Sequence, residues 1–442
     1  MSNFSGGVAS FAILLVLLAL RVPIGVAMLA VGAGGFIWIQ GLTPLLLFLK
    51  TTPFETFANY TFSVIPLFLF MGNVASGAGL SSRLFRGANA MVGHFKGGMA
   101  MAAVGACAAF GTICGSSLAT AATMGQVALP EMRKYGYSGA LATGTLAAGG
   151  TLGILVPPSV PLVIYAILTE QNIAKLFLAA FIPAALAILG FCIAIRATVA
   201  INPAAGPATP KQPWGQRWRA IFEMWPVLGI FFIVFIGMNG DFFFGRSLFT
   251  PTEGAAIGAL LATIAALTIG KMTFRDIIGP VRSTAEQSGM IFIILLGAEI
   301  YNSFLARTGM PQVLAHWVAG LGISPYLIMA VIVVIYILLG CLMDSLSMIL
   351  LTIPIFFPVV MGLNFGLTPE HTAIWFGILA LIVVELGLIH PPVGLNVYVI
   401  HKIAGDVTML ETFKGVVPFL IAEFVRVSLI VAFPVLTLML IK

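Results

Sequence analysis

The chain has 442 residues, of which 60% are hydrophobic and only 8% are charged, and its formal net charge is +6. Soluble domains carry about 25% charged residues, so this composition excludes a soluble enzyme or a nucleic-acid-binding protein, in spite of an isoelectric point near 9.2. A helix that spans a bilayer needs about 20 apolar residues, and the chain is therefore predicted to be an all-α polytopic membrane protein.

Apolar runs between charged or Pro/Gly-rich segments predict ten spans in chain order. The first half contains 8–21, 23–40, 59–80, 139–169 and 173–197, and the second contains 224–240, 252–270, 284–306, 371–401 and 412–441. The stretch after Met1 has no Lys or Arg before it, so we expect a first span there and not a cleavable signal peptide. Four cysteines lie in apolar runs without metal-ligand spacing, which favours small buried side chains: Cys107, Cys114, Cys192 and Cys341.

Two further apolar stretches, 98–132 and 325–361, are too long for one helix and contain polar residues in the middle. The interruptions are G-T-I-C-G-S-S (111–117) and G-C-L-M-D-S-L-S (340–347). Each half has about 13–15 residues, or ~20 Å of helix, which is shorter than the hydrocarbon core of ~30 Å. We therefore predict two re-entrant helical hairpins whose tips meet near the middle of the membrane.

The two halves of the chain resemble each other. L-G-I-L-V-P-P (152–158) returns as L-G-L-I-H-P-P (386–392), and the two hairpin tips begin at Gly111 and Gly340. Each half then has five crossings, and because this number is odd, the second half is expected to be inverted relative to the first. Inverted repeats with interrupted helices in matching positions are typical of secondary transporters and indicate where the binding site lies.

Basic residues are distributed unevenly over the predicted loops. With an external N-terminus, fifteen basic residues fall in the inner loops, and Arg426 falls within the last span. Five fall outside: Lys50, Lys175, Arg246, Arg307 and Lys442. The positive-inside rule therefore predicts that both termini are external. The Pro-rich segment 201–220 joins the halves on the inner side, either as a linker or with a short interfacial helix at Trp214.

The tips and the two L-G-x-x-x-P-P breaks are candidate binding regions, because interrupted backbone at membrane depth must be buried in protein or line a cavity. Helix carbonyl ends attract a small cation and helix N-termini attract an anion, so one site can hold both sodium and a carboxylate. The predicted sodium-binding residues are Gly111, Thr112, Ser116, Gly149, Gly153, Val156, Pro157, Gly340, Cys341, Asp344, Gly387 and His390. The predicted substrate-binding residues are Ser117, Pro158, Ser159, Ser345, Ser347, Pro391, Pro392, Gly394 and Asn396.

These residue types also have structural interpretations, which stay open. The hydroxyl residues can cap the half-helix that follows them, and the glycines, Gly150 included, either unwind the backbone or serve close helix packing. Asp344 is a functional candidate because it is ionisable and at membrane depth, or it is a capping carboxylate. Glu385 can hydrogen-bond the exposed backbone near the second break, Glu299 is expected to be structural, and His390 contacts a ligand or packs. The sequence contains no H-E-x-x-H motif and no Walker glycine loop, so it does not support hydrolysis of peptides or ATP.

Four segments, 111–137, 150–159, 343–359 and 385–396, resemble the large membrane subunit of TRAP (tripartite ATP-independent periplasmic) transporters. The resemblance covers essentially the whole chain, although His390 and Cys114 stand where smaller residues are commoner in the family. It implies an elevator-type importer of organic acids in the bacterial inner membrane, driven by sodium and without a further cofactor. The implied partners are a periplasmic substrate-binding protein and a small four-helix membrane subunit. We expect this subunit to be a separate chain, because no four-span extension precedes the first span.

The resemblance also implies a division of the chain into a scaffold and a moving transport domain. Scaffold helices of the two repeats are expected at 1–97 and 223–323, the last helix of each repeat at 171–200 and 405–442, and a cytoplasmic linker at 201–222. The transport domain combines 98–170 and 324–404, each a hairpin with a broken helix. An alternative is a stand-alone ion-coupled carboxylate transporter of the same architecture that needs no binding protein. An intramembrane enzyme would need a nucleophile–base pair and a channel would need a continuous polar span, and the sequence shows neither.

Overall fold

The computed structural model describes residues 3–240, 242, 245–341 and 343–441, and these form helices joined by turns, without a β-strand among them. The first half contains α1 (Asn3–Ala19), α2 (Ile24–Gln40), α3 (Leu42–Ala58), α4 (Val64–Gly77), α5 (Leu80–Val92), α6 (Gly98–Cys114), α7 (Ser117–Lys134), α8 (Gly139–Leu155), α9 (Val160–Leu168) and α10 (Ile173–Ile201). The second half contains α11 (Trp214–Met238), α13 (Pro251–Thr268), α14 (Ile278–Thr308), α15 (Met310–Gly320), α16 (Pro325–Gly340), α17 (Ser345–Met361), α18 (Pro369–Gly387), α19 (Leu395–Ala404), α20 (Met409–Ala432) and α21 (Val435–Leu438). Leu342 of the second predicted tip and Lys442, one of the predicted external basic residues, lie outside the described residues.

Most of the predicted spans are confirmed as long apolar helices. Seven helical segments of the described residues can cross a membrane by length and composition: 60–77, which ends with α4, and α10, α11, α13, α14, α18 and α20. The pair α8–α9, bent by 43°, makes an eighth. Helices α1 and α2 match the other two predicted spans but have 17 residues each, about 25 Å of helix at 1.5 Å per residue. The chain is therefore a multi-pass helical membrane protein.

Three helices, α3, α5 and α15, lie in segments that the sequence analysis assigned to loops. The search for long apolar runs missed α5 because this helix is amphipathic, with Leu84 and Phe85 buried and Arg86 exposed. It missed α3 because Lys50 and Pro53 interrupt the apolar run. A helical periodicity of 3.6 residues in 80–92 was the signal that would have identified α5.

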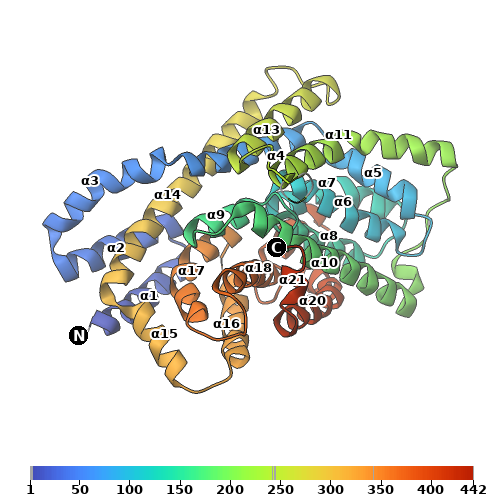
Figure 1. The fold of residues 1–442 in the computed structure, drawn as a ribbon. Coiled ribbons are helices and arrows are strands. Elements are labelled where there is room, and N and C mark those ends of the chain that lie inside the picture. Colours follow the sequence, from blue (N-terminus) through green and yellow to red (C-terminus); the bar gives the residue numbers. More distant parts are fainter. Residues whose placement is uncertain (1–2, 241, 243–244, 342, 442) are drawn as a thin grey trace.

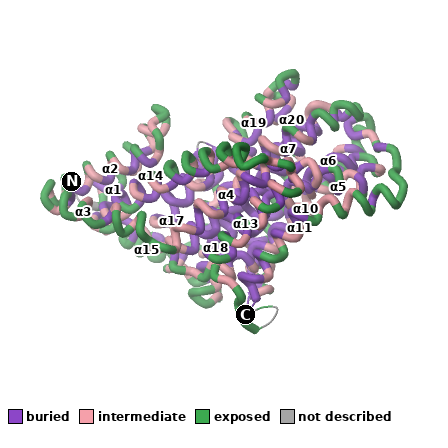
Figure 2. Tube along the Cα trace, turned by 90° about the horizontal axis from the view of Figure 1, so that it is seen from above, coloured by how far each residue is buried: buried purple, intermediate pink, exposed green. Residues whose placement is uncertain are grey.

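The protein is elongated, with its most enclosed helices in the middle (Figures 1 and 2). Helices α1, α2 and α3 lie at one end and α5 and α6 at the other, while α4, α13, α17 and α18 lie between them (Figure 2). Every residue of α18 from Thr372 to Gly387 is buried, and so is every residue of α8 from Leu141 to Leu155. These two helices are the first parts of the two predicted broken spans, so both breaks begin at the buried end of an enclosed helix.

Charged residues from loops that were predicted to lie on the same side do meet. Arg133 in the last turn of α7 pairs with Asp406 after α19, and both belong to predicted inner loops. Lys175 and Glu370, from two predicted outer loops, pair at 2.5 Å. The grouping of loops into two sides agrees with the structure, while the assignment of one side as cytoplasmic stays a prediction.

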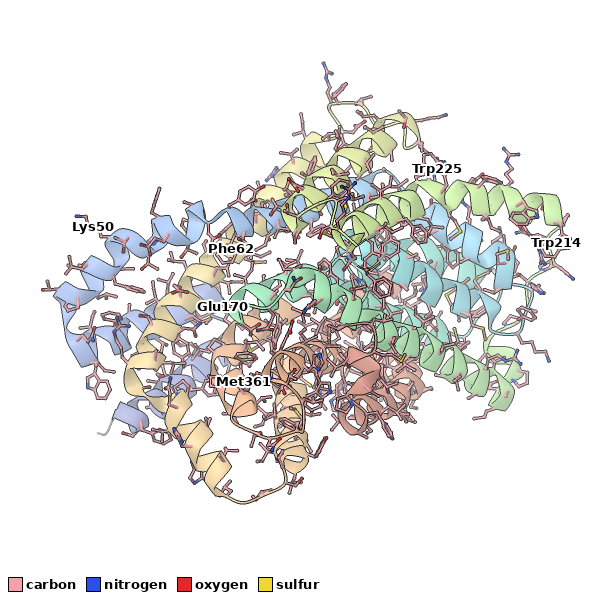
Figure 3. All side chains as sticks on the ribbon, viewed as in Figure 1. Lys50, Phe62, Glu170, Trp214, Trp225 and Met361 are labelled. Atoms are coloured by element: carbon pink, nitrogen blue, oxygen red, sulfur yellow. The ribbon has the colours of Figure 1, made fainter. Side chains whose placement is uncertain are left out.

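The segment between the halves is partly helical. Helix α11 begins at Trp214 and continues to Met238, so the proposed interfacial helix and the span that follows are one helix, and the expected boundary at 222 falls inside it. Trp214 and Trp225 lie on this outer helix, at the far end of the molecule from Lys50 on α3 (Figure 3).

Candidate functional site

The two hairpins are present, and each has a sharp tip with a capped second helix. Gly115, with φ of +61°, ends α6, and Ser116 is the N-cap of α7, where its Oγ accepts a hydrogen bond from the Ala119 N–H at 3.4 Å. Asp344 is the N-cap of α17 and accepts from the Ser347 N–H at 3.2 Å, while the Ser347 hydroxyl donates to the same carboxylate. The capping interpretations of Ser116 and Asp344 are therefore confirmed.

The hairpin helices are longer than predicted. They have 17 and 18 residues in the first hairpin and 16 and 17 in the second, where the sequence analysis expected about 13–15. In the first hairpin Gly111–Cys114 remain helical, the Gly115 N–H donates to the Gly111 carbonyl at 2.9 Å, and the Thr112 hydroxyl is satisfied within α6 by the Ala109 carbonyl at 2.7 Å. The polar interruption of the first tip is thus confined to Gly115 and Ser116.

Glycines fasten each hairpin to the broken helix of its own half. A Cβ on Gly111 would lie 2.6 Å from the Cα of Gly153, and a Cβ on Gly340 would lie 3.0 Å from the Cα of Gly387. Ordinary carbon–carbon contacts are 3.5–4.0 Å, so only glycine permits this approach. The two contacts involve corresponding residues of the two halves, and they bring four predicted sodium-binding residues together in two pairs.

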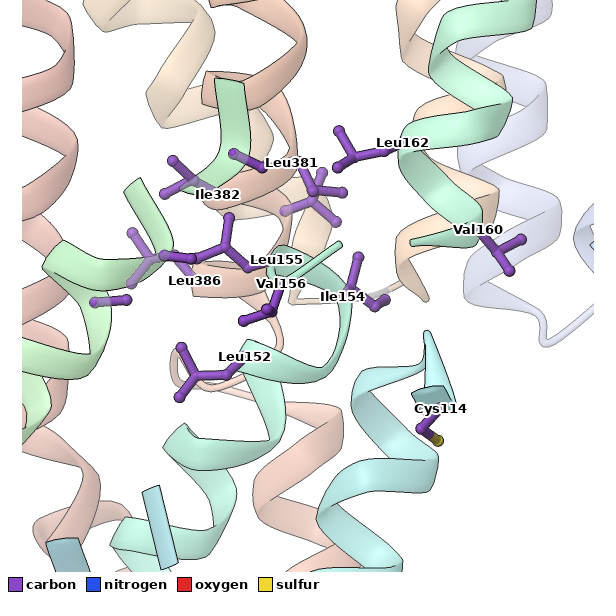
Figure 4. Close-up of a cluster of buried hydrophobic side chains, with 14 of the residues drawn as sticks. Cys114, Leu152, Ile154, Leu155, Val156, Val160, Leu162, Leu381, Ile382 and Leu386 are labelled. Atoms are coloured by element: carbon purple, nitrogen blue, oxygen red, sulfur yellow. The ribbon is translucent and has the colours of Figure 1, made fainter. Parts of the chain in front are cut away.

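The first break begins later than predicted. Of the two interpretations left open for the glycines in 149–153, close packing agrees with the structure and unwinding does not, because α8 remains helical through Leu155 and the break comprises 156–159. The cause of the break is Pro157–Pro158, because proline lacks an N–H and restricts the residue before it. Residues 156–159 are buried, and side chains of this region pack against those of Leu381, Ile382 and Leu386 on α18 (Figure 4).

The second break, residues 388–394, is wider and more exposed. Pro391 and Pro392 are exposed, and Gly394, with φ of +59°, is the N-cap of α19, which agrees with the expected backbone freedom. The Cys341 sulfur at the hairpin tip lies 3.6 Å from the carbonyl oxygen of His390 and 3.5 Å from that of Pro391. His390 Nδ1 lies 2.5 Å from the latter oxygen. The structure thus brings Cys341 and His390 together, away from the first tip.

A cavity of about 170 Å³ lies where the two tips meet α4 and α14. Four predicted site residues line it: Ser116, Ser117, Asp344 and Ser345. Its remaining wall is mostly apolar, with Leu69 of α4, Met290 and Ile291 of α14, and Leu118 and Leu346 after the tips. The N-termini of α7 and α17 both face this space, and the first amide groups of a helix have no partner within it. The geometry suits a small anionic ligand.

Glu385 connects the tips behind this cavity. Its carboxylate accepts a hydrogen bond from the Ser117 hydroxyl through Oε2 and one from the Ser345 hydroxyl through Oε1, the latter at 2.7 Å. Only 1% of Glu385 is exposed. Exposed backbone near the second break was one possible partner of Glu385, but in the structure its partners are two side chains from opposite halves.

The other predicted residues do not line the cavity, and apart from His390, Pro391 and Pro392 they are buried. Gly149 packs against Cys107 of α6, where a Cβ would lie 2.9 Å from the sulfur, which favours the packing interpretation. Ser159 is fully buried, and its hydroxyl has no hydrogen-bond partner within the described part of the chain. Asn396 of α19 donates through Nδ2 to the Ala147 carbonyl of α8 at 3.3 Å, so it joins the two broken helices.

The sequence analysis missed several buried polar residues. Gln287 of α14 lines the cavity, 3.5 Å from Asn73 of α4, and both are amides in apolar spans that a search for ionisable residues overlooks. Thr120 of α7 is fully buried beside Gly153, with a hydroxyl that has no partner among the residues described.

A buried ion pair also lies in the last long helix. Arg426, which the sequence analysis left unexplained, pairs with Glu423 one turn earlier in α20, and it also donates to the Pro183 carbonyl of α10 at 3.3 Å. The i, i+3 spacing of opposite charges within an apolar run was the signal for this pair.

The architecture and these motifs can be compared with known proteins. The family model described as "Tripartite ATP-independent periplasmic transporter, DctM component" matches residues 11–436. The chain belongs to this family.

Among the relatives of this TRAP permease, the C4-dicarboxylate TRAP transporter large permease protein DctM of Pseudomonas aeruginosa is 34% identical, with 87% of each chain covered. The sialic acid TRAP transporter large permease protein SiaM of Vibrio cholerae is 31% identical, with 86% of each chain covered. The ectoine TRAP transporter large permease protein TeaC of Halomonas elongata is 27% identical, with 85% of each covered. The chain is therefore a substrate-transporting permease subunit of a TRAP system in an inner membrane, and it is not an enzyme.

Solved structures with the same fold are transporters of low sequence similarity. The Alcanivorax borkumensis YdaH transporter aligns with a TM-score of 0.60 and 14% identity, over 96% of this chain and 97% of that chain. Neisseria gonorrhoeae MtrF aligns with a TM-score of 0.54 at the same identity, over 93% of this chain and 94% of that chain. At this identity the likeness supports the fold alone.

Proposed function

We propose that this TRAP permease imports a small organic acid together with sodium ions, and that it receives the acid from a periplasmic binding protein and works with a small four-helix membrane subunit. The observation that carries this proposal is the cavity between the tips of the two hairpins. Two helix N-termini face it, from α7 and α17, and they offer partial positive charge to a carboxylate.

The same cavity supports coupling to a cation. None of its described lining residues is Lys, Arg or His, and Asp344 adds a carboxylate to the wall. Helix N-termini supply only about half an elementary charge each, and an unpaired charge at membrane depth is expensive. A bound anion is therefore most stable when a cation binds with it, and sodium is the proposed cation.

Two loops are proposed as sodium sites. In the first, the Gly111–Gly153 contact brings the tip of the hairpin against α8, and the free hydroxyl of Thr120 adds a donor atom that the sequence analysis did not include. In the second, the carbonyl oxygens of His390 and Pro391 converge on the region of Cys341. Backbone and hydroxyl oxygens are suitable ligands for hard cations.

The proposed moving body consists of 98–170 and 324–404, and the proposed scaffold is the rest of the chain. The glycine contacts fasten each hairpin to its broken helix, and Asn396 joins the broken helices to each other. Elements that are fastened in this way move together more readily than they separate. The same proposal includes an elevator motion of this body. It also places both termini of the chain in the periplasm and inverts the second half of the chain relative to the first.

The substrate is proposed to be a small carboxylate. The relatives named above are described as carrying C4-dicarboxylates or sialic acid, and a cavity of 170 Å³ is smaller than the ~300–1,000 Å³ pockets of drug-sized ligands. The tips are therefore close together, and a larger acid would require them to separate.

The test is uptake by vesicles that contain the chain with its small subunit, supplied with the binding protein and substrate. Accumulation is expected only with an inward sodium gradient, and equal uptake when potassium replaces sodium at an unchanged pH gradient would refute sodium coupling. Uptake that persists when the binding protein is omitted would instead support the stand-alone transporter.

A further inference from the structure

One buried carboxylate contacts both hairpins. Glu385 lies on α18 two residues before the end of the helix, and its two oxygens accept hydrogen bonds from Ser117 and Ser345. Ser117 is the first residue of α7 in the first hairpin, and Ser345 is the first residue of α17 in the second. All three residues are at most 4% exposed, so these contacts are shielded from bulk solvent.

The first half has no equivalent carboxylate. When L-G-I-L-V-P-P is aligned with L-G-L-I-H-P-P, Thr151 occupies the position of Glu385. The Thr151 hydroxyl donates to the Ala148 carbonyl of its own helix at 2.6 Å. A residue needed only to pack a broken helix would be expected in both halves, so the single carboxylate indicates a contact between the halves.

Glu385 itself does not line the cavity between the tips, whereas both of its serine partners do. Because each serine donates its hydroxyl hydrogen to Glu385, these hydroxyls are directed away from a ligand in the cavity. What α7 and α17 offer to an anion is then their first backbone amides. The distance between the first amides of α7 and those of α17 depends on the contact that holds the two helix N-termini together.

We propose that Glu385 is a positioning residue that joins the two hairpin tips and holds the N-termini of α7 and α17 at the separation at which both face the cavity. Its effect on transport rests on the function proposed above, but the joint between the tips does not. Without the carboxylate both serine hydroxyls lose their buried partner, and the two tips lose their common anchor.

The charge and the position of Glu385 can be separated by two variants. Glu423 and Arg426 of α20 also act on Glu385 electrostatically, so removal of the side chain changes more than the joint. Glu385→Gln removes the ionisable group but keeps the shape, since a Gln amide accepts from one serine and donates to the oxygen of the other. Glu385→Ala removes both contacts.

The direct experiment measures the separation of the tips. Spin labels are attached at Leu118→Cys and Leu346→Cys, both half-buried residues just after the tips, in the full chain with its four native cysteines replaced by alanine. We expect a narrow distance distribution with Glu385 and with Glu385→Gln, and a broader or longer one with Glu385→Ala. An unchanged distribution in Glu385→Ala would overturn the proposal.

Uptake provides the second measurement. Glu385→Ala is expected to raise the half-saturating concentrations of sodium and of loaded binding protein several-fold, with little change in maximal rate per assembled protein, and Glu385→Gln is expected to restore them. If Glu385→Ala does not assemble, Ser117→Ala and Ser345→Ala each remove one contact by deleting a single oxygen. Half-saturation values unchanged in both serine variants would count against the joint.

A matched control is Tyr336→Phe. It removes a buried hydroxyl that is 2.8 Å from the Thr352 hydroxyl, and this contact lies within the second hairpin and does not join the tips. Its half-saturation values are expected to stay unchanged. A rise equal to that of Glu385→Ala would show that loss of any buried hydrogen bond in this region impairs uptake, and it would overturn the proposal. Sodium-independent uptake by the unaltered protein, together with a broadened distribution in Glu385→Ala, would refute the proposed function and leave the joint intact.

Discussion

The contact between α6 and α8 predicts that an added methyl group has opposite effects on stability at two glycines of α6. In Gly111→Ala the added Cβ would lie 2.6 Å from the Cα of Gly153 and 2.9 Å from the Leu152 carbonyl oxygen. Both neighbours are backbone, so they cannot rotate away, and the two helices must separate by roughly 1 Å to reach ordinary contact. Overpacking of this kind costs about 1–3 kcal/mol.

Gly105→Ala is the matched control, because it places the same group six residues earlier in α6. A Cβ there would meet nothing within 4 Å. Alanine is favoured over glycine in a helix by about 0.5–1 kcal/mol, so this variant is expected to be slightly stabilised. The preference for alanine applies at both positions and cancels, so the difference between the two variants should be about 1–3 kcal/mol, which is the cost of overpacking alone.

The assay is the apparent midpoint of thermal unfolding of each purified variant in the same detergent, followed by uptake in vesicles. We expect a lower midpoint and reduced uptake for Gly111→Ala, because the shift reaches the first tip. Equal midpoints and equal uptake for the two variants would refute the assignment of this contact.

The remaining predictions concern the second tip, the buried ion pair and the orientation. Asp344→Asn keeps the shape of the cap but removes a charge whose interaction with the helix dipole is worth about 0.3–2 kcal/mol, so the sodium concentration for half-maximal uptake should rise several-fold. Asp344→Ala should do more harm, since loss of the cap costs about 0.5–2 kcal/mol more; sodium curves that match the unaltered protein in both variants would exclude this role. Arg426→Leu leaves the buried Glu423 unpaired at a cost of about 3–5 kcal/mol, so the midpoint of thermal unfolding should fall sharply and recover when Glu423→Leu is added; a single variant as stable as the unaltered protein would contradict this. A cysteine at Lys211 should resist an impermeant thiol reagent in intact spheroplasts while one at Lys50 reacts, and the reverse pattern would overturn the predicted topology.

The parts of the fold that could be predicted are those encoded in local runs of sequence. Long apolar runs identified eight helical spans, and the polar residues inside 98–132 and 325–361 located both hairpins. The capping roles of Ser116 and Asp344 also follow from neighbours along the chain, because an N-cap binds an amide only three residues away.

The sequence placed the first interruption too early because local polarity was taken to mean unwound backbone, and it left open whether the glycines in 149–153 unwind or pack. Residues 111–114 and 149–153 are helical, and their glycines let α6 and α8 approach each other. Whether a glycine unwinds or packs depends on what faces it, and the facing residue is far away in the sequence. The prediction of a loop at 80–92 was wrong for a different reason. The amphipathic pattern of α5 was present, but only long apolar runs were considered.

By itself, the sequence determined that this protein is a helical membrane transporter with two hairpins and two broken spans, because hydrophobicity, proline and helix-capping residues act over a few neighbouring positions. Only the tertiary structure decided that Glu385 binds Ser117 and Ser345, and that Gln287 lines the cavity between the tips. These residues come from helices of both halves, and no local pattern specifies which of many buried polar side chains will become partners. Their pairing is decided by the packing of whole helices, since a buried polar group must find its partner wherever that packing places one.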